Sequence, residues 1–136
     1  MEVHQSSYTI ALFGEAEKGK YQTAYFCQNL AQLAEYFGNP PPGSLGIYYA
    51  VQALLFKRNL IFFRVVEEGY SKQDYFSGLN FLEKQKVISK VDAICTPGVG
   101  DKQIIDAIVP VCTLHHSIFI TNESDFYDYL TFINEN

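Results

Sequence analysis

The segment from Gly14 to Tyr21 contains residue types that could bind phosphate. It follows an apolar run and places Gly14, Gly19 and Lys20 at the spacing of a phosphate-binding loop, Gly-x-x-x-x-Gly-Lys. In such a loop the glycines let backbone N–H groups surround the phosphates, the lysine contacts the terminal ones, and a following Ser or Thr holds Mg²⁺. Here Tyr21 occupies the metal-binding position, and two glutamates inside the loop would repel phosphate. A small nucleotide- or phosphate-binding protein that uses Gly14, Gly19 and Lys20 is therefore the alternative hypothesis for function.

A second loop contains the candidate ligand residues Thr96, Gly98, Gly100 and Asp101. It lies between a predicted strand and a predicted helix, where open α/β sheets often bind ligands. Cys95 comes directly before it, but a catalytic cysteine needs a histidine or another cation to lower its pKa. No histidine is tied to this loop by its spacing. The pattern favours a tight turn followed by a helix cap over a cysteine-hydrolase site.

The remaining reactive residue types form no recognisable site. Cys27, Cys95 and Cys112 have no metal-ligand spacing and lie in apolar stretches, which is typical of reduced, packed thiols. The adjacent histidines 115 and 116 point in different directions on one chain, so we expect no metal site and no cofactor there. The acidic pair Glu67–Glu68 lacks an acid/base partner in the sequence, and we expect both carboxylates to face solvent. No catalytic residue is assigned, so an enzyme is the less favoured class.

The bulk properties limit the class of protein. The chain has 136 residues, 48% hydrophobic and 15% aromatic, which predicts a single folded domain over 1–136. Its net charge is −5 and its basic residues are scattered, so we expect no nucleic-acid partner. The sequence shows no signal peptide and no apolar run long enough to cross a bilayer, which predicts a cytoplasmic protein with no membrane partner. Abundant Tyr and Phe favour protein partners.

The elements that position these residues alternate along the chain. Strands are predicted over 8–13, 23–27, 60–66, 91–95 and 117–121. Helices are predicted over 30–37, 45–58 and 75–86, after Asp101, and over 124–133. Such alternation indicates βαβ units. We therefore predict an α/β fold of three layers, with a largely parallel sheet of about four to five strands and helices on both faces.

Helix boundaries are also predicted from single residues. Asn29, Ser44, Asp101 and Ser124 are expected to be N-caps, because their side chains can accept hydrogen bonds from the first free backbone N–H groups. Pro110 falls inside the helix that follows Asp101 and is expected to kink it or end it early.

The order of these segments resembles the conserved core of contractile tail sheath proteins of phages and related injection systems. In that family a strand leads into a Gly-x-Ala-x-x-Gly loop, a short strand and a helix ending in Phe-Gly. A Leu-x-x-Ala-Val type helix, a Val-Arg-Val strand, a Gly-Leu helix, a strand ending in Pro-Gly and a Cys-containing helix follow. The counterparts here are Phe13 to Gly19, Ala24 to Gly38, Leu45 to Val51, Phe62 to Val65, Gly78-Leu79, Ile94 to Gly98 and Ile104 to Cys112.

The resemblance implies a non-enzymatic structural or assembly module that associates with itself or with a phage-like or contractile injection apparatus. It also implies that the loop from Gly14 to Gly19 is structural. Sheath subunits are several times longer, carry surface domains where this chain has only Val66 to Asp74, and use terminal arms that add strands to neighbouring subunits. A minimal relative, a cap or adaptor, and a retained domain with another role therefore all remain open.

Overall fold

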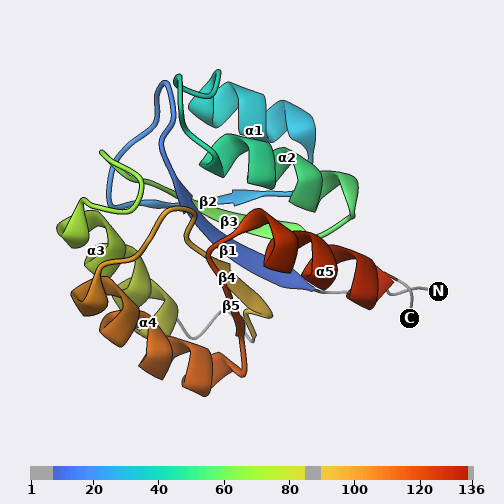
Figure 1. Cartoon of the computed structure of the whole chain (residues 1–136). Helices are drawn as coiled ribbons and strands as arrows, with labels where there is room; N and C mark the ends of the chain where they lie inside the picture. The colour runs from blue at the N-terminus through green and yellow to red at the C-terminus, as the bar shows by residue number, and fades with distance from the viewer. Residues whose placement is uncertain (1–7, 85–89, 135–136) are drawn as a thin grey trace.

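The computed structural model describes residues 8–84 and 90–134 as one sheet with helices packed on it (Figure 1). The strands are β1 (Thr9–Gly14), β2 (Ala24–Cys27), β3 (Asn59–Arg64), β4 (Ala93–Cys95) and β5 (Ile118–Ile120). The helices are α1 (Leu30–Phe37), α2 (Gly46–Leu55), α3 (Lys72–Lys84), α4 (Lys102–His115) and α5 (Glu123–Asn134).

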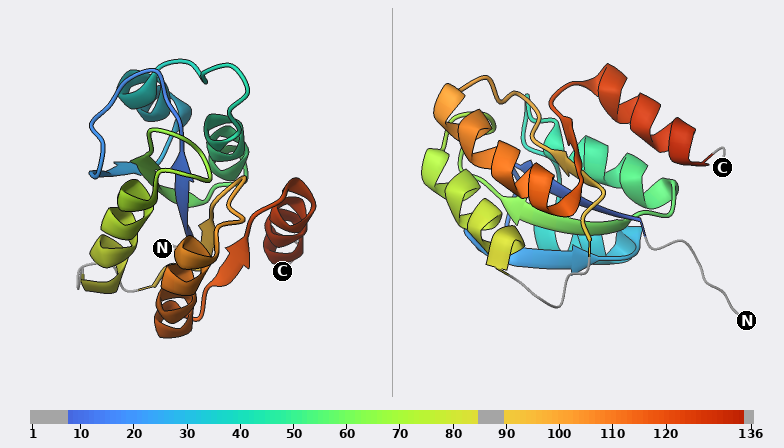
Figure 2. Two further views of the ribbon diagram at one scale, coloured as in Figure 1. Left: turned by 60° about the vertical axis from the view of Figure 1, so that its left-hand side comes forward. Right: turned by 90° about the horizontal axis from the view of Figure 1, so that it is seen from below.

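The sheet is largely parallel, in the order β2-β3-β1-β4-β5. β1 pairs in parallel with β3 and β4, β4 pairs in parallel with β5, and β2 runs antiparallel to β3 at one edge. The central strand β1 is apolar on both faces because it is covered on both sides, as expected for an interior parallel strand. α1, α2 and α5 cover one face and α3 and α4 the other (Figures 1 and 2). The predicted three-layer α/β fold is confirmed.

Alternating residues of β1 anchor two separate cores. Leu12 faces the layer of α1, α2 and α5, where Phe37 stacks at a tilt against Phe62 of β3. Phe13 faces α3 and α4 and lies 4.7 Å from the ring of Phe63 and 5.2 Å from that of Tyr75. The period of two along the strand thus sends neighbouring side chains into different layers. Within the described residues, no helix is long and apolar enough to span a membrane.

Two of the four predicted helix caps are confirmed. The side chain of Asn29 accepts a hydrogen bond from the N–H of Gln32, and Asp101 accepts one from Ile104. Gln32 in turn accepts from Gln28. These caps are local, so the sequence alone is enough to place them.

The predicted caps Ser44 and Ser124 are wrong, and Pro110 does not end its helix early; the kink at Pro110 stays a prediction. The hydroxyl of Ser44 donates to the carbonyl of Pro41 and makes no bond to α2. Asn122 rather than Ser124 accepts from the first turn of α5, through the N–H of Asp125. The helix α4 does not end early, because it continues past Pro110 to His115.

The chain order creates a switch point between β1 and β4. After β1 the chain crosses to β3 on one side, and after β3 it returns through α3 to β4 on the other side. In open α/β sheets, ligands bind outside the carboxyl ends of the strands at such a point. The loops after β1, β3 and β4 are therefore the first place to look for a site.

Candidate functional site

The carboxylate of Glu68 lies at the centre of these loops. Its Oε2 accepts hydrogen bonds from the backbone N–H groups of Glu15 (2.9 Å) and Gly46 (2.8 Å), and its Oε1 accepts from Leu45 (2.9 Å). The N–H groups of Leu45 and Gly46 belong to the start of α2, where unpaired donors and the helix dipole favour a negative charge. Glu68 therefore fills, with the protein's own carboxylate, the place where such a fold could hold an anion.

Glycine at two positions lets these backbones come close enough to share Glu68. A β-carbon added at Gly14 would lie 2.6 Å from the Cα of Gly46 and 3.0 Å from Oε2 of Glu68. A β-carbon at Gly46 would meet the Cα of Gly14 at the same distance. The end of β1 and the start of α2 can touch only because neither residue has a side chain.

The loop that carries Glu68 is fixed from several directions. The N–H of Glu68 donates to the side chain of Glu15 (3.0 Å), which makes the bonding between these two residues reciprocal. The buried Asp74 accepts from the N–H of Val66, and the buried Tyr75 hydroxyl accepts from Gly69. Such bonds hold a carboxylate in one position without help from a ligand.

The loops after β3 and β4 also touch directly. Gly69 has φ +90°, and a β-carbon there would lie 2.5 Å from the carbonyl oxygen of Gly98. Any other residue at position 69 would have to adopt a strained backbone and displace the neighbouring loop. The contact brings one loop against the other beside the switch point.

The first candidate set, Gly14, Gly19 and Lys20, does not form a phosphate cradle. Gly19 has φ +107° and its carbonyl accepts from Arg64 (2.6 Å), whereas the N–H of Lys20 donates to the hydroxyl of Tyr25 (2.8 Å). No helix starts directly after Lys20, because β2 comes next and the next described helix, α1, begins at Leu30. The dipole and free N–H groups that a phosphate-binding loop needs are absent at this position.

The second set, Thr96, Gly98, Gly100 and Asp101, forms a turn and a helix cap. Thr96 is fully buried, and Gly98 has φ +82°. The N–H of Ile104 donates a hydrogen bond to the carboxylate of Asp101, and this bond is the main reason that the pKa of the Asp101 carboxyl is lowered. The cap of α4 is thus already made by the protein.

The cysteines are placed for packing rather than for reaction. Cys95 is fully buried, and burial, with a smaller contribution from Glu68, raises its pKa well above the ordinary value. Burial also raises the pKa of Cys27 and Cys112 to about 11. Because the thiolate is the reactive form, these environments suppress nucleophilic chemistry.

His115 takes part in packing between segments of the chain. His115 is buried and bonds through its two ring nitrogens to the N–H of Val91 (3.3 Å) and the carbonyl of Leu82 (2.9 Å), so it joins α4 to α3 and to the segment before β4. Over residues 8–84 and 90–134, no group of three His, Cys, Asp or Glu residues could hold a metal ion.

Glu68 is the residue of this region that sequence reasoning missed. The pair Glu67–Glu68 was expected to be solvated; Glu67 is exposed, but Glu68 is partly buried under the start of α2. Glu68 and Gly46 are 22 positions apart in the chain. A cap of this kind leaves no local signal in the sequence, in which Ser44 is the nearest candidate cap.

Comparisons with known proteins add no identification. No protein-family model matches this chain. No curated protein matches its sequence.

Proposed function

We propose that this chain is a non-enzymatic assembly module, comparable to a minimal tail sheath domain, that associates through the edges of its sheet. The observation that carries the proposal is the composition of its two edge strands. β2 (Ala24–Cys27) and β5 (Ile118–Ile120) contain no charged residue and no proline. Natural proteins usually protect an unpaired edge with lysine, proline or a bulge, because it offers free backbone groups to another chain.

Both edges also expose apolar side chains. Phe26 on β2 is 50% exposed and Ile118 on β5 is 48% exposed. On β5, the N–H of Ile118 and the carbonyl of Ile120 bond towards β4, which directs the backbone groups of Phe119 to the opposite side. Addition of a strand from another subunit would pair those groups and cover the apolar side chains.

The protein's own contacts occupy the switch point between β1 and β4, which also favours an assembly module over a ligand-binding protein. Glu68 accepts hydrogen bonds from the N–H groups of Leu45 and Gly46 at the start of α2, and the loops after β3 and β4 touch. The alternative of a nucleotide- or phosphate-binding protein has no geometric support at Gly14, Gly19 and Lys20. The outer surfaces remain as the places where this domain can act.

Sedimentation velocity over a rising protein concentration tests the proposal. We expect the wild-type protein to form oligomers and Ile118→Lys to shift the distribution towards monomer, since a charge on the edge blocks strand addition. Leu55→Lys is the matched control, because Leu55 is 55% exposed on α2, which packs over the middle of the sheet. A wild-type protein that stays monomeric, or equal effects of the two variants, would contradict association through the edges.

A further inference from the structure

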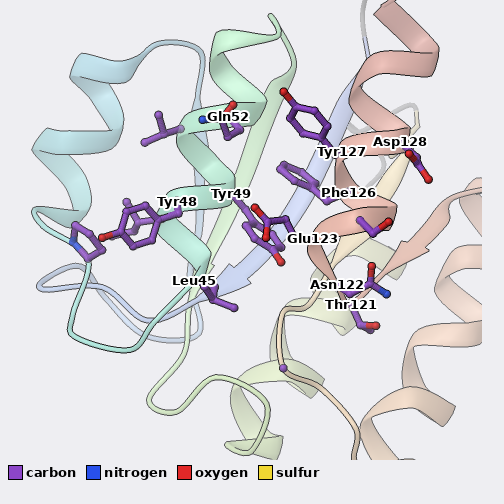
Figure 3. Close-up of a pocket in the computed structure, with 15 residues that line it drawn as sticks. Leu45, Tyr48, Tyr49, Gln52, Thr121, Asn122, Glu123, Phe126, Tyr127 and Asp128 are labelled. Carbon is purple, nitrogen blue, oxygen red and sulfur yellow. The ribbon is translucent and has the colours of Figure 1, made fainter.

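A long groove separates α2 from α5 on one face of the molecule (Figure 3). Its volume is about 1360 Å³, and it extends from Pro40 to the start of α5, reaching Gly98 of the second candidate loop. This is larger than the roughly 300–1,000 Å³ typical of small-molecule pockets. The dimensions favour a segment of a macromolecule over a small ligand.

The base and walls of the groove are aromatic. Tyr49 and Phe126 stack with ring centroids 4.6 Å apart and planes 8° from parallel, which ties α2 to α5 at the base. Tyr127 of α5 points towards α2 and is 54% exposed, and Leu45 at the start of α2 is 45% exposed; Tyr48, 59% exposed, lies on the side of α2 that faces away from α5 (Figure 3). Rigid aromatic side chains of this kind are the usual anchors of protein interfaces.

The charge of the groove has one sign. Its charged lining residues are Glu123 and Asp128, and no lysine, arginine or histidine lines it among the described residues. Both carboxylates are exposed on α5, and the described residues form no ion pair with either of them. Glu123 points towards α2, whereas Asp128 lies on the side of α5 that faces away from α2 (Figure 3). An apolar surface with an acidic rim is complementary to an apolar segment that carries positive charge.

The walls determine the backbone form of that segment. α2 and α5 satisfy their own backbone hydrogen bonds, so an extended peptide would find no ladder to join. A helix brings its own bonds and needs only an apolar face. The groove is lined by α2 as far as Gln52 and by α5 as far as Asp128, which corresponds to lengths of roughly 9–11 Å, or about two helical turns.

We propose that the groove between α2 and α5 docks a basic amphipathic helix of a partner protein, in contact over about two turns, with its apolar face on Tyr49, Phe126 and Tyr127 and a lysine or arginine near Glu123. This names the partner chemistry of the assembly module and therefore rests on the proposed function. A second copy of this chain is a poorer occupant, because two acidic rims would face each other and the chain has net charge −5. Nucleic acid is disfavoured by the same charge.

Binding of two designed peptides tests the proposal directly. The first is an amphipathic peptide of about 14 residues with leucines on one helical face and lysines on the other. The second carries glutamate in place of each lysine. Isothermal titration should show binding of the lysine peptide with at least tenfold higher affinity than the glutamate peptide, and amide NMR shifts should change in α2 and α5.

Substitutions in the groove test whether the peptide binds at this site. Tyr127→Ser should weaken the lysine peptide about tenfold, as expected for loss of an interface tyrosine. Val109→Ser is the matched control, because Val109 is 52% exposed on α4 over the other face of the sheet, and it should leave affinity unchanged. The variant Glu123→Lys should abolish the preference for the lysine peptide, with its fold verified by circular dichroism.

Several outcomes would overturn the proposal. Equal binding of the two peptides, no binding of either, or shifts spread outside α2 and α5 each contradict it using wild-type protein alone. If neither peptide binds while Ile118→Lys still disrupts association, the groove proposal fails and the assembly function stands. If the lysine peptide binds and Ile118→Lys has no effect, association through the edges fails and the groove is a docking site in its own right.

Discussion

The substitution Glu68→Ala should strongly destabilise the protein, although Glu68 lies outside the hydrophobic core. It removes the shared acceptor of three backbone N–H groups, those of Glu15, Leu45 and Gly46. It also removes the negative charge from the start of α2. The adjacent substitution Glu67→Ala is the matched control, because the side chain of Glu67 is exposed.

The magnitude follows from the bonds that are lost. A buried or partly buried donor left without its charged acceptor costs about 1–3 kcal/mol. Water can reach this partly exposed site, and Glu15 repels the charge of Glu68, so we take the lower end for each of the three bonds, or about 3 kcal/mol in total. With an unfolding entropy of about 2.1 cal/mol/K per residue, the expected fall in Tm is roughly 10 °C.

Differential scanning calorimetry measures this fall, and added anions probe its cause. The variant exposes free N–H groups at a helix start, so acetate or phosphate should bind there and raise its Tm relative to chloride at equal ionic strength. The wild-type protein, whose own carboxylate fills the site, should show no such rise. The reasoning is refuted if Glu68→Ala melts within about 2 °C of Glu67→Ala, or if the anions stabilise both proteins equally.

Two further predictions concern close packing and thiol chemistry. Gly14→Ala should lower the free energy of unfolding measured in urea by about 2 kcal/mol or more, because its β-carbon would overlap the Cα of Gly46. The control Gly100→Ala should change it by less than about 0.5 kcal/mol, because no atom lies within 4 Å of the added β-carbon. Equal effects of the two substitutions would contradict the close contact. Iodoacetamide at pH 8 should label Cys95 and Cys112 at least roughly a hundredfold more slowly in the folded protein than in urea, because the raised pKa of each thiol leaves little thiolate. Rapid labelling of Cys95 in the folded protein would restore the hypothesis of a reactive cysteine.

The fold was predictable where the signal is local. The apolar run that becomes β1 and the caps Asn29 and Asp101 depend on neighbouring residues, and the structure confirms them. The antiparallel direction of β2 and its place beside β3 depend on long-range pairing, which periodicity does not encode.

The chemistry of the candidate site was less predictable for the same reason. The glycines at 14 and 19 match a phosphate loop in spacing, but the pattern cannot reveal that the nearest helix start belongs to α2 and is capped by Glu68. The groove was also hidden from the sequence, because Tyr49 and Tyr127 come from helices far apart in the chain. Both features arise only when distant segments pack together.

Electron microscopy of the concentrated protein, compared with Ile118→Lys under the same conditions, tests the assembly function most directly. Our account predicts regular oligomers of the wild-type protein whose formation is lost in the edge variant while circular dichroism shows an unchanged fold. Dispersed single particles of the wild-type protein at every concentration, or identical oligomers in both proteins, would contradict it.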